Sequence, residues 1–244
     1  MAKLAASKEL VEDLVAANRI LAAHEVLDAY GHVSARSDKR PERFLMSRSR
    51  APALVTAADL IEWNAESETA AGDKRKGFIE RYIHGEIYRA RPDVIAIVHS
   101  HSPSVIPFGV TRTKLRPVYH MGSFLWSGAP VWDIRKVREE NDLLVRDRPL
   151  GEALASALGK CNCVLMRGHG FTVVGESVPE AVFRAIYTEM NARLQLEAAQ
   201  LEGPIEFLSD EEGRRSTAAN RGTLERPWEL WKASVAAATR RSRG

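Results

Sequence analysis

The sequence predicts an α/β fold, with helices and strands alternating along the chain or layered as α/β/α. Three observations support this class. Apolar residues recur at helical spacing in several segments, short runs rich in β-branched residues lie between them, and Gly or Pro residues mark the changes. With 244 residues, 45% of them hydrophobic and 27% charged, the chain has the composition of a folded, water-soluble protein.

The first half of the chain predicts two helices and a buried strand. Apolar side chains share one face in both helices, and the strand VIAIVH is rich in β-branched residues. Thr56 followed by Asp59 is a helix-start signal of the capping-box kind, at the beginning of TAADLIEW. The elements that we expect are a helix at 7–29, extended pieces at 32–35 and 44–46, a polar loop at 65–77, a helix at 78–91 and a strand at 94–99.

The second half repeats the alternation and ends in a helical tail. Trp228, Trp231 and Val235 lie on one helix face, and exposing two tryptophans would leave a sizeable apolar patch. We therefore expect a catalytic domain at 1–208 and a tail at 209–244 whose helix docks on its own core or on another subunit. The other expected elements are a helical patch at 104–108, loops up to 120, a strand at 129–132, a helix at 150–158, two strands within 163–175 and a helix from Pro179 to about Leu201.

Charge and cysteine content exclude several classes of protein. The net charge is +3, and eight basic against five acidic residues after 208 supply it, so we expect no nucleic-acid partner. Lys3, Lys8 and Glu9 interrupt the first segment, so we expect no membrane contact or export and a cytoplasmic location. Cys161 and Cys163 are one residue apart, which suits neither a disulfide nor a four-cysteine zinc site.

Three of the seven histidines lie in contexts unlike ordinary core packing. His99 and His101 alternate at the end of a strand, so their side chains point the same way. His169 stands between two glycines, where the backbone can turn tightly. Three converging imidazoles would leave open positions on a divalent metal, as in catalytic sites. A His-x-His pair alone is often incidental, so the spacing needs further support.

Glu80 and His84 are one helical turn apart, just before the strand that ends in His99. A carboxylate near a metal with an open position suits a general acid or base, so Glu80 is our first catalytic candidate. Judged by local sequence, a surface ion pair with Arg81 or Arg75 is an equal alternative. We expect His84 to pack the helix or to support a metal ligand from behind.

These residues belong to a longer pattern with a known likeness. The run E-x-x-x-H-x-x-x-Y-x-x-R-P-D-V-x-A-x-V-H-S-H-S-P, from Glu80 to Pro103, and the later R-G-H-G resemble the class II aldolase/adducin family across about residues 8–205. The resemblance implies an α/β/α sandwich around a mostly antiparallel sheet and a homotetramer with active sites at subunit interfaces. It also implies that His99, His101 and His169 bind the metal and that Glu80 moves protons.

The chain departs from the sugar-phosphate aldolases of that family. They hold phosphate with a G-N-x-S segment and a Ser-Ser pair before the glutamate, whereas this chain has G-H-V-S and then Phe78 and Ile79. Apolar side chains cannot donate hydrogen bonds to a phosphate. Guanidinium groups suit a planar carboxylate, although a solvated loop is the alternative for this segment. Our candidates for substrate binding are Ser47, Arg48, Arg50 and His32.

Several segments, among them G-H-V-S-A-R and S-R-S-R-A-P, are most similar to the decarboxylase branch of the family. This likeness implies a decarboxylase of an ortho-hydroxy aromatic or heteroaromatic dicarboxylate that depends on a divalent metal. The substrate that it favours is 3-hydroxy-2-methylpyridine-4,5-dicarboxylate, an acid of vitamin B6 degradation. Mn²⁺ is the expected ion and Zn²⁺ the alternative. His120 and Tyr119 are further candidates for the proton donor, and Phe78, Phe124 and Trp126 either line an aromatic pocket or pack the core.

Two other functions compete with this prediction. One is a class II aldolase or epimerase that acts on a small sugar or sugar phosphate. The other is an adducin-like binding module without catalysis. The intact histidines and Glu80 favour an enzyme over the second alternative, because a binding module has no need of them.

Overall fold

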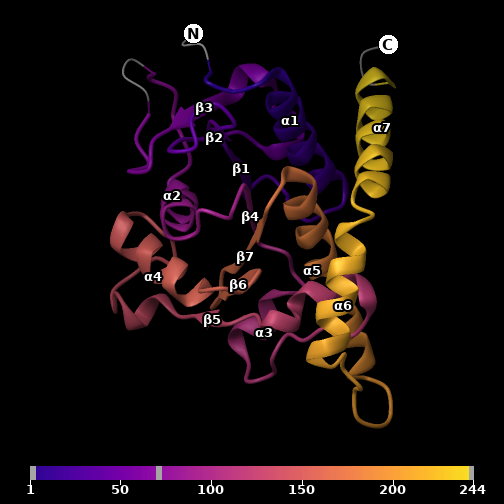
Figure 1. Cartoon of the computed structure of the whole chain (residues 1–244). Coiled ribbons are helices and arrows are strands. Elements are labelled where there is room, and N and C mark those ends of the chain that lie inside the picture. The colour runs from indigo at the N-terminus through magenta and orange to yellow at the C-terminus, as the bar shows by residue number, and fades with distance from the viewer. Residues whose placement is uncertain (1–3, 70–72, 242–244) are drawn as a thin grey trace.

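The structure, a computed structural model, describes residues 4–69 and 73–241 and contains one seven-stranded sheet between layers of helices (Figure 1). The strand order is β3-β2-β1-β4-β7-β6-β5, and every neighbouring pair is antiparallel except β5 and β6. The strands are β1 (His32–Arg36), β2 (Phe44–Ser47), β3 (Leu60–Trp63), β4 (Ala96–Ser100), β5 (Val131–Trp132), β6 (Cys163–Met166) and β7 (Gly170–Gly175).

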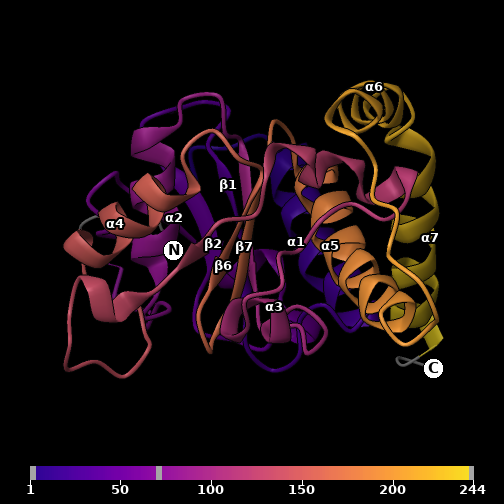
Figure 2. The same cartoon turned by 90° about the horizontal axis from the view of Figure 1, so that it is seen from below.

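Helices cover both faces of the sheet, as Figure 2 shows. On one face lie α2 (Arg81–Ala90) and α4 (Arg148–Leu158), and on the other lie α1 (Lys8–Ala23) and α5 (Val178–Ala198). The helices α6 (Asp210–Arg221) and α7 (Glu225–Arg241) lie outside α5 and α1. The expected α/β/α sandwich around a mostly antiparallel sheet is confirmed. The short helical pieces are α3 (Ile106–Val110), η1 (Pro52–Leu54), η2 (Ala57–Asp59), η3 (His120–Ser127) and η4 (Ile134–Lys136).

The central strand β4 is buried along its whole length, which explains the continuous apolar run VIAIV in the sequence. Ala96 and Val98 pack into the core beneath α1 and α5, whereas Ile97 packs into the core beneath α2 and α4. A strand buried on both faces needs apolar residues at every position. The same alternation turns His99 toward the α2 face, where the candidate site lies.

One helix-start signal is followed by a strand in the structure. Asp59 accepts hydrogen bonds from the backbone N–H and the hydroxyl of Thr56, at 2.9 and 2.7 Å, as a capping box requires. This capping box begins only the single turn η2. The chain does not continue as a helix, because Leu60–Trp63 pair with β2 and are buried along their whole length. Helix α1 is also shorter than expected and ends at Ala23, since Glu25 turns the chain with a positive φ of 57°.

The C-terminal segment packs on the same chain. Trp228 and Trp231 are buried in the core shared with α1 and α5, and Lys232 forms an ion pair with Asp13 at 2.6 Å. The sequence did not separate α6 from α7, and η3 occupies the stretch between the loops expected up to 120 and the strand expected at 129–132. Among the helices of residues 4–69 and 73–241, none is long and apolar enough to cross a membrane.

Candidate metal centre

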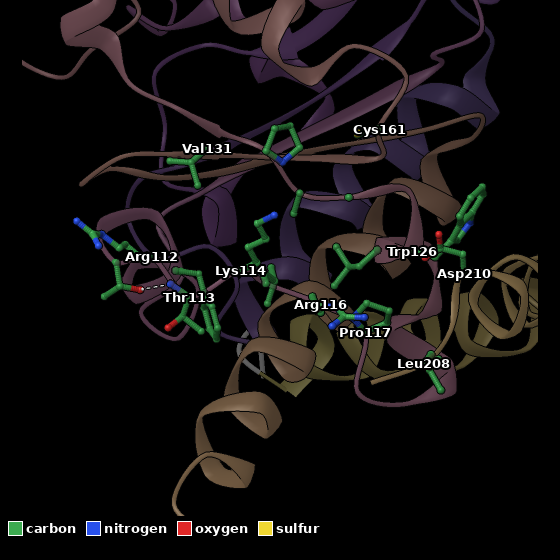
Figure 3. A pocket seen from close by; sticks show the side chains of 17 residues that line it. Arg112, Thr113, Lys114, Arg116, Pro117, Trp126, Val131, Cys161, Leu208 and Asp210 are labelled. Atoms are coloured by element: carbon green, nitrogen blue, oxygen red, sulfur yellow. Dashed lines mark hydrogen bonds between the residues drawn. The ribbon is translucent and has the colours of Figure 1, made fainter. Parts of the chain in front are cut away.

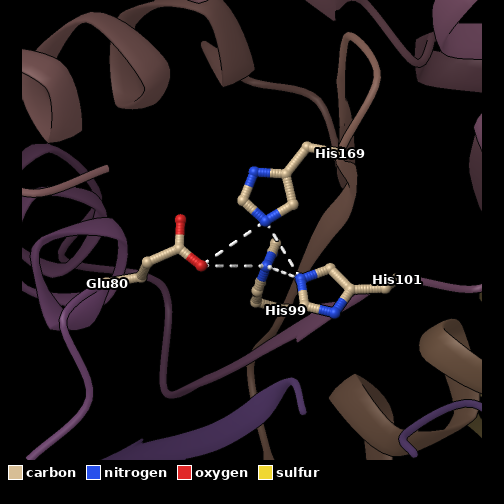
Figure 4. A group of neighbouring side chains, drawn as sticks. All are labelled: Glu80, His99, His101 and His169. Carbon is tan, nitrogen blue, oxygen red and sulfur yellow. Dashed lines mark hydrogen bonds and ion pairs between the residues drawn. The ribbon is translucent and has the colours of Figure 1, made fainter. Parts of the chain in front are cut away.

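Four side chains from three parts of the chain converge at one end of β4 (Figure 4). One ligand atom from each, three imidazole nitrogens and a carboxylate oxygen, lies within 4.8 Å of all the others. The Nε2 atom of His101 is 3.1 Å from that of His99 and 3.0 Å from that of His169. Glu80 Oε2 lies 3.7 Å from His99 Nε2 and 3.4 Å from His169 Nε2.

Strand pairing and glycines bring these residues together. His99 pairs with Thr172 across β4 and β7, and His169 lies in the turn that connects β6 to β7. The backbone of this turn passes close to β4, so that a Cβ at Gly170 would lie 2.0 Å from the carbonyl oxygen of Ser100. Gly168 adopts a positive φ of 67°, which glycine tolerates and which reverses the chain before His169.

Backbone groups behind the cluster orient its ligand atoms. His99 Nδ1 donates to the carbonyl of Phe171 at 3.1 Å, and His169 Nδ1 donates to the carbonyl of Leu143 at 2.8 Å. A neutral imidazole that donates from Nδ1 keeps a lone pair on Nε2, and in both residues Nε2 faces the centre. The backbone N–H of Val145 donates to Glu80 Oε1 at 3.0 Å and leaves Oε2 toward the histidines.

The electrostatics of the cluster suit a cation. Burial, together with the neighbouring histidines, lowers the pKa of His99 well below its usual value, and burial likewise lowers the pKa of His101. Burial opposes the charge on His169, but the hydrogen bond and charge of Glu80 outweigh it and raise its pKa. The Nε2 atoms of His99 and His169 both face the centre, at 3.1 and 3.0 Å from His101 Nε2, so a cation placed there would meet three imidazole nitrogens. Three imidazoles and a carboxylate therefore fit Mn²⁺ or Zn²⁺.

A pocket of about 330 Å³ opens beside the cluster, with Glu80 and His101 in its wall. Phe78 offers it an aromatic face, and Arg50 and Lys76 are its two basic residues. The sequence reasoning missed Lys76 and Tyr30, although Lys76 ends the basic run KRKG shortly before Glu80. The cavity thus combines two of the candidate metal ligands, the aromatic rings of Phe78 and Tyr30, and two cations.

Of the four candidates for substrate binding, two line the pocket and two do not. His32 and Arg50 line the pocket, and Arg50 is held by the carbonyl of Leu54 at 2.8 Å. Arg48 is absent from the pocket wall and pairs with Asp59 at 2.6 Å. Ser47 is buried, and its hydroxyl has no partner among the described residues. Arg50 and His32 are therefore better placed than Arg48 and Ser47 to meet a ligand.

The further proton-donor candidates lie elsewhere in the chain. Tyr119 precedes η3 and packs against Tyr187 of α5. His120 begins η3, and its carbonyl accepts a hydrogen bond from Asn220 of α6 at 2.7 Å. Neither residue lines the pocket at the cluster. A role for either in this site would require a second copy of the chain.

Only one of the three candidate pocket aromatics faces the cluster. Phe124 is buried in the core against Phe183, with ring centroids 6.4 Å apart. Trp126 lines a separate hollow of about 550 Å³, between the loop after α3 and the segment that leads to β5 (Figure 3). Of these three residues, only Phe78 lines the pocket beside the candidate metal ligands.

A sandwich of this topology, with a His₃Glu cluster at the end of its central strand, defines the class II aldolase type of protein. Residues 12–196 match the family described as Class II Aldolase and Adducin N-terminal domain, and the chain belongs to that family. It is 40% identical to the decarboxylase tropJ of Talaromyces stipitatus, over 92% of this chain and 93% of that protein. It is 35% identical to a 3,4-dihydroxyphthalate decarboxylase of Terrabacter, over 82% and 84% of the two chains.

The fold likeness extends to solved structures. An aldolase II superfamily protein from Pseudomonas syringae superposes with a TM-score of 0.78 over 94% of this chain and 93% of that chain, at 22% sequence identity. At this level of identity the likeness shows the fold alone. The choice between decarboxylation and aldol chemistry therefore depends on the residues of the pocket.

Proposed function

We propose that this protein is a metal-dependent decarboxylase of a hydroxylated aromatic dicarboxylate. The observation that carries the proposal is the composition of one cavity, which joins the His₃Glu cluster to Phe78, Arg50 and Lys76. The names of the two decarboxylase relatives support the same chemistry. Phe78 and Ile79 replace the pair of hydroxyl donors with which family aldolases hold a phosphate, so the cavity favours an aromatic acid over a sugar phosphate.

His99, His101 and His169 would hold the divalent ion, which supplies a Lewis acid that stabilises negative charge on the substrate oxygens. Phe78 packs against the ring of the substrate, and Arg50 and Lys76 bind the carboxylate that stays in the product. Glu80 takes the proton of the ring hydroxyl at Oε2 and delivers it to the carbon that carries the leaving carboxylate. The bond to CO₂ then breaks, its electron pair returns to the ring, and the phenolate oxygen takes a proton from water.

The same proposal extends to the substrate, the metal ion and the oligomeric state. We infer 3-hydroxy-2-methylpyridine-4,5-dicarboxylate as the first acid to test, and hydroxyphthalates as the next because a relative is named for one. Mn²⁺ is the proposed ion, with Zn²⁺ as the alternative that the same ligands accept. We also propose a homotetramer whose sites lie at subunit interfaces, which would bring Tyr119 and His120 of one copy toward the pocket of another.

The test is CO₂ release from a panel of hydroxy-pyridine and hydroxyphthalate diacids with added Mn²⁺ or Zn²⁺. We expect release from at least one diacid, loss of release after chelation, and recovery when the ion is restored. Sugar phosphates assayed for cleavage and epimerisation test the aldolase alternative. Cleavage of a sugar phosphate without CO₂ release from any diacid would refute the proposal. Purified protein that binds no metal would favour the binding module.

A further inference from the structure

Three charged side chains meet at the turn η2, beside the wall of the pocket. Arg48 Nε donates to Asp59 Oδ1 at 2.6 Å, and a terminal nitrogen of Arg50, Nη1, lies 3.4 Å from the same oxygen. Arg50 Nε donates to the carbonyl of Leu54 at 2.8 Å. Of the three charged residues, only Arg50 lines the pocket. One carboxylate is thus shared between an arginine outside the pocket and an arginine in its wall.

Asp59 is a negative charge with a fixed position. Its side chain is buried, and Oδ2 accepts hydrogen bonds from the backbone N–H and the hydroxyl of Thr56 at 2.9 and 2.7 Å. Burial opposes the charge on Asp59, but the hydrogen bonds from Thr56 and Arg48 and the charge of Arg50 outweigh it and lower its pKa. The carboxylate is therefore ionised at neutral pH, and the turn that it caps sets the direction of Oδ1.

The donor groups of Arg50 are divided between the protein and the pocket. A guanidinium group only donates hydrogen bonds, so the direction of each contact is fixed. Nε is used by Leu54 and Nη1 faces Asp59, whereas Nη2 has no partner within residues 4–69 and 73–241. Because two anchors already hold the side chain, less of its rotational freedom is lost when an anion binds. Nη2 is the group that Arg50 offers to a carboxylate in the pocket.

The balance of charge gives the second arginine a role. Arg50 and Asp59 alone would form a neutral pair, which attracts an anion only weakly. Arg48, 2.6 Å from Asp59, makes the group two cations and one anion, so a net positive charge remains. Lys76 lies on the neighbouring loop, whose carbonyl at this residue accepts the backbone N–H of Ser49 at 2.8 Å. The pocket wall therefore stays positively charged while Arg50 is held in place.

We propose that Asp59 is a positioning residue for the second carboxylate of the substrate: it holds Arg50 in the pocket wall, and Arg48 offsets the negative charge that Asp59 brings. The choice of a dicarboxylate as the ligand rests on the function proposed above, whereas the anchoring of Arg50 does not. Arg48 acts through Asp59 from outside the pocket, which gives both arginines of the S-R-S-R segment a part in one site.

The anchoring of Arg50 can be tested without a ligand, by crystal structures of the wild type and of Asp59→Asn. The amide oxygen of asparagine can still accept the backbone N–H of Thr56, so the turn η2 should remain. The amide nitrogen would face both guanidinium groups, which have no acceptor to offer it. We expect one conformation of Arg50 in the wild type and its departure from Leu54 and the pocket wall in the variant. An Arg50 side chain in the same place in both structures would overturn the proposal.

Phthalate binding to the Zn²⁺-loaded protein, measured by calorimetry, tests the effect on a diacid. Asp59→Asn removes a negative charge, which by itself would strengthen the binding of a dianion. We expect instead that it weakens phthalate binding about 3- to 10-fold, the value of one hydrogen bond whose donor is no longer held in place. Arg48→Gln leaves the charge of Asp59 less compensated and should weaken binding about 2- to 5-fold. Tighter binding by Asp59→Asn would show that only its charge matters and would refute the positioning role.

A double-mutant cycle with Arg50→Ala separates positioning from a general loss of structure. Without the guanidinium group Asp59 has nothing to position, so Asp59→Asn should no longer weaken phthalate binding. Asp93→Asn is the matched control, since it removes an aspartate that pairs with Arg91 outside the pocket, and it should leave binding unchanged. Equal losses from Asp59→Asn in the two backgrounds would contradict the proposal. If phthalate does not bind the wild type, the proposed substrate class fails and the crystal structures alone decide the role of Asp59.

Discussion

Glu80→Gln should separate metal binding from proton transfer. Oε1 of Glu80 accepts the backbone N–H of Val145 at 3.0 Å, and the amide oxygen of glutamine can keep that hydrogen bond. The amide nitrogen would then stand where Oε2 lies, 3.4 Å from His169 Nε2. It cannot take a proton from the ring hydroxyl or return one to the ring carbon. The three histidines keep their lone pairs, so the ion should stay bound.

Glu80→Gln should lower the turnover number strongly. A positioned general acid or base contributes roughly 10²- to 10⁴-fold to a rate. We expect kcat to fall by at least about 10²-fold, which corresponds to about 2.7 kcal/mol of lost transition-state stabilisation. KM for the diacid should change little, because Arg50 and Lys76 are untouched.

The assay combines initial rates of CO₂ release with elemental analysis of the same samples. Glu66→Gln is the matched control, since Glu66 is an exposed glutamate in the loop after β3. Turnover within about threefold of the wild type, with metal retained, would refute the role of Glu80 and move the proton transfer to His120 or Tyr119. Loss of metal in Glu80→Gln would make the carboxylate a ligand that the ion needs.

The other predictions concern the ligands, the arginines and acid stability. Replacing any one cluster histidine with alanine should remove both metal and CO₂ release while far-UV circular dichroism stays unchanged, and a variant with full metal content would not have lost a ligand. Arg50→Ala should raise KM for the diacid about 10- to 150-fold, the value of a charged hydrogen bond, and leave a monoacid unaffected. Arg48→Ala should change the diacid KM less, because Arg48 pairs with Asp59 outside the pocket; the reverse order would contradict this placement. Burial lowers the pKa of His84 from 6.5 to about 3, so the unfolded state binds the extra proton between these values. Above pH 6.5 neither the folded nor the unfolded state binds this proton, so His84 does not lower the free energy of unfolding. Between pH 6.5 and about 3 the free energy of unfolding falls by up to about 1.4 kcal/mol for each pH unit. His84→Gln should flatten that decline in chemical unfolding series, and an unchanged slope would argue against a buried neutral His84.

The sequence determined the features that depend on short stretches of chain. Alternation along the VIAIVHSH run places His99 and His101 on one side wherever the strand lies. The glycines beside His169 allow the tight turn, and the apolar periodicity of 78–91 predicts the helix that follows Glu80. These local regularities, joined in one motif, were enough to indicate the family and the sandwich fold.

The tertiary structure decided which distant groups meet. Leu60–Trp63 form a strand because β2 offers them a partner, although Thr56 and Asp59 carry a helix-start signal. Asp59 pairs with Arg48, which lies outside the pocket wall, and with Arg50, which lines it, and Lys76 joins the pocket from a loop with no periodicity. A hydrogen bond between His32 and His84 spans 52 positions in the chain. Local patterns fix backbone conformation and facing, but hydrogen bonds and ion pairs between remote residues depend on how whole elements pack, which no short stretch of sequence contains.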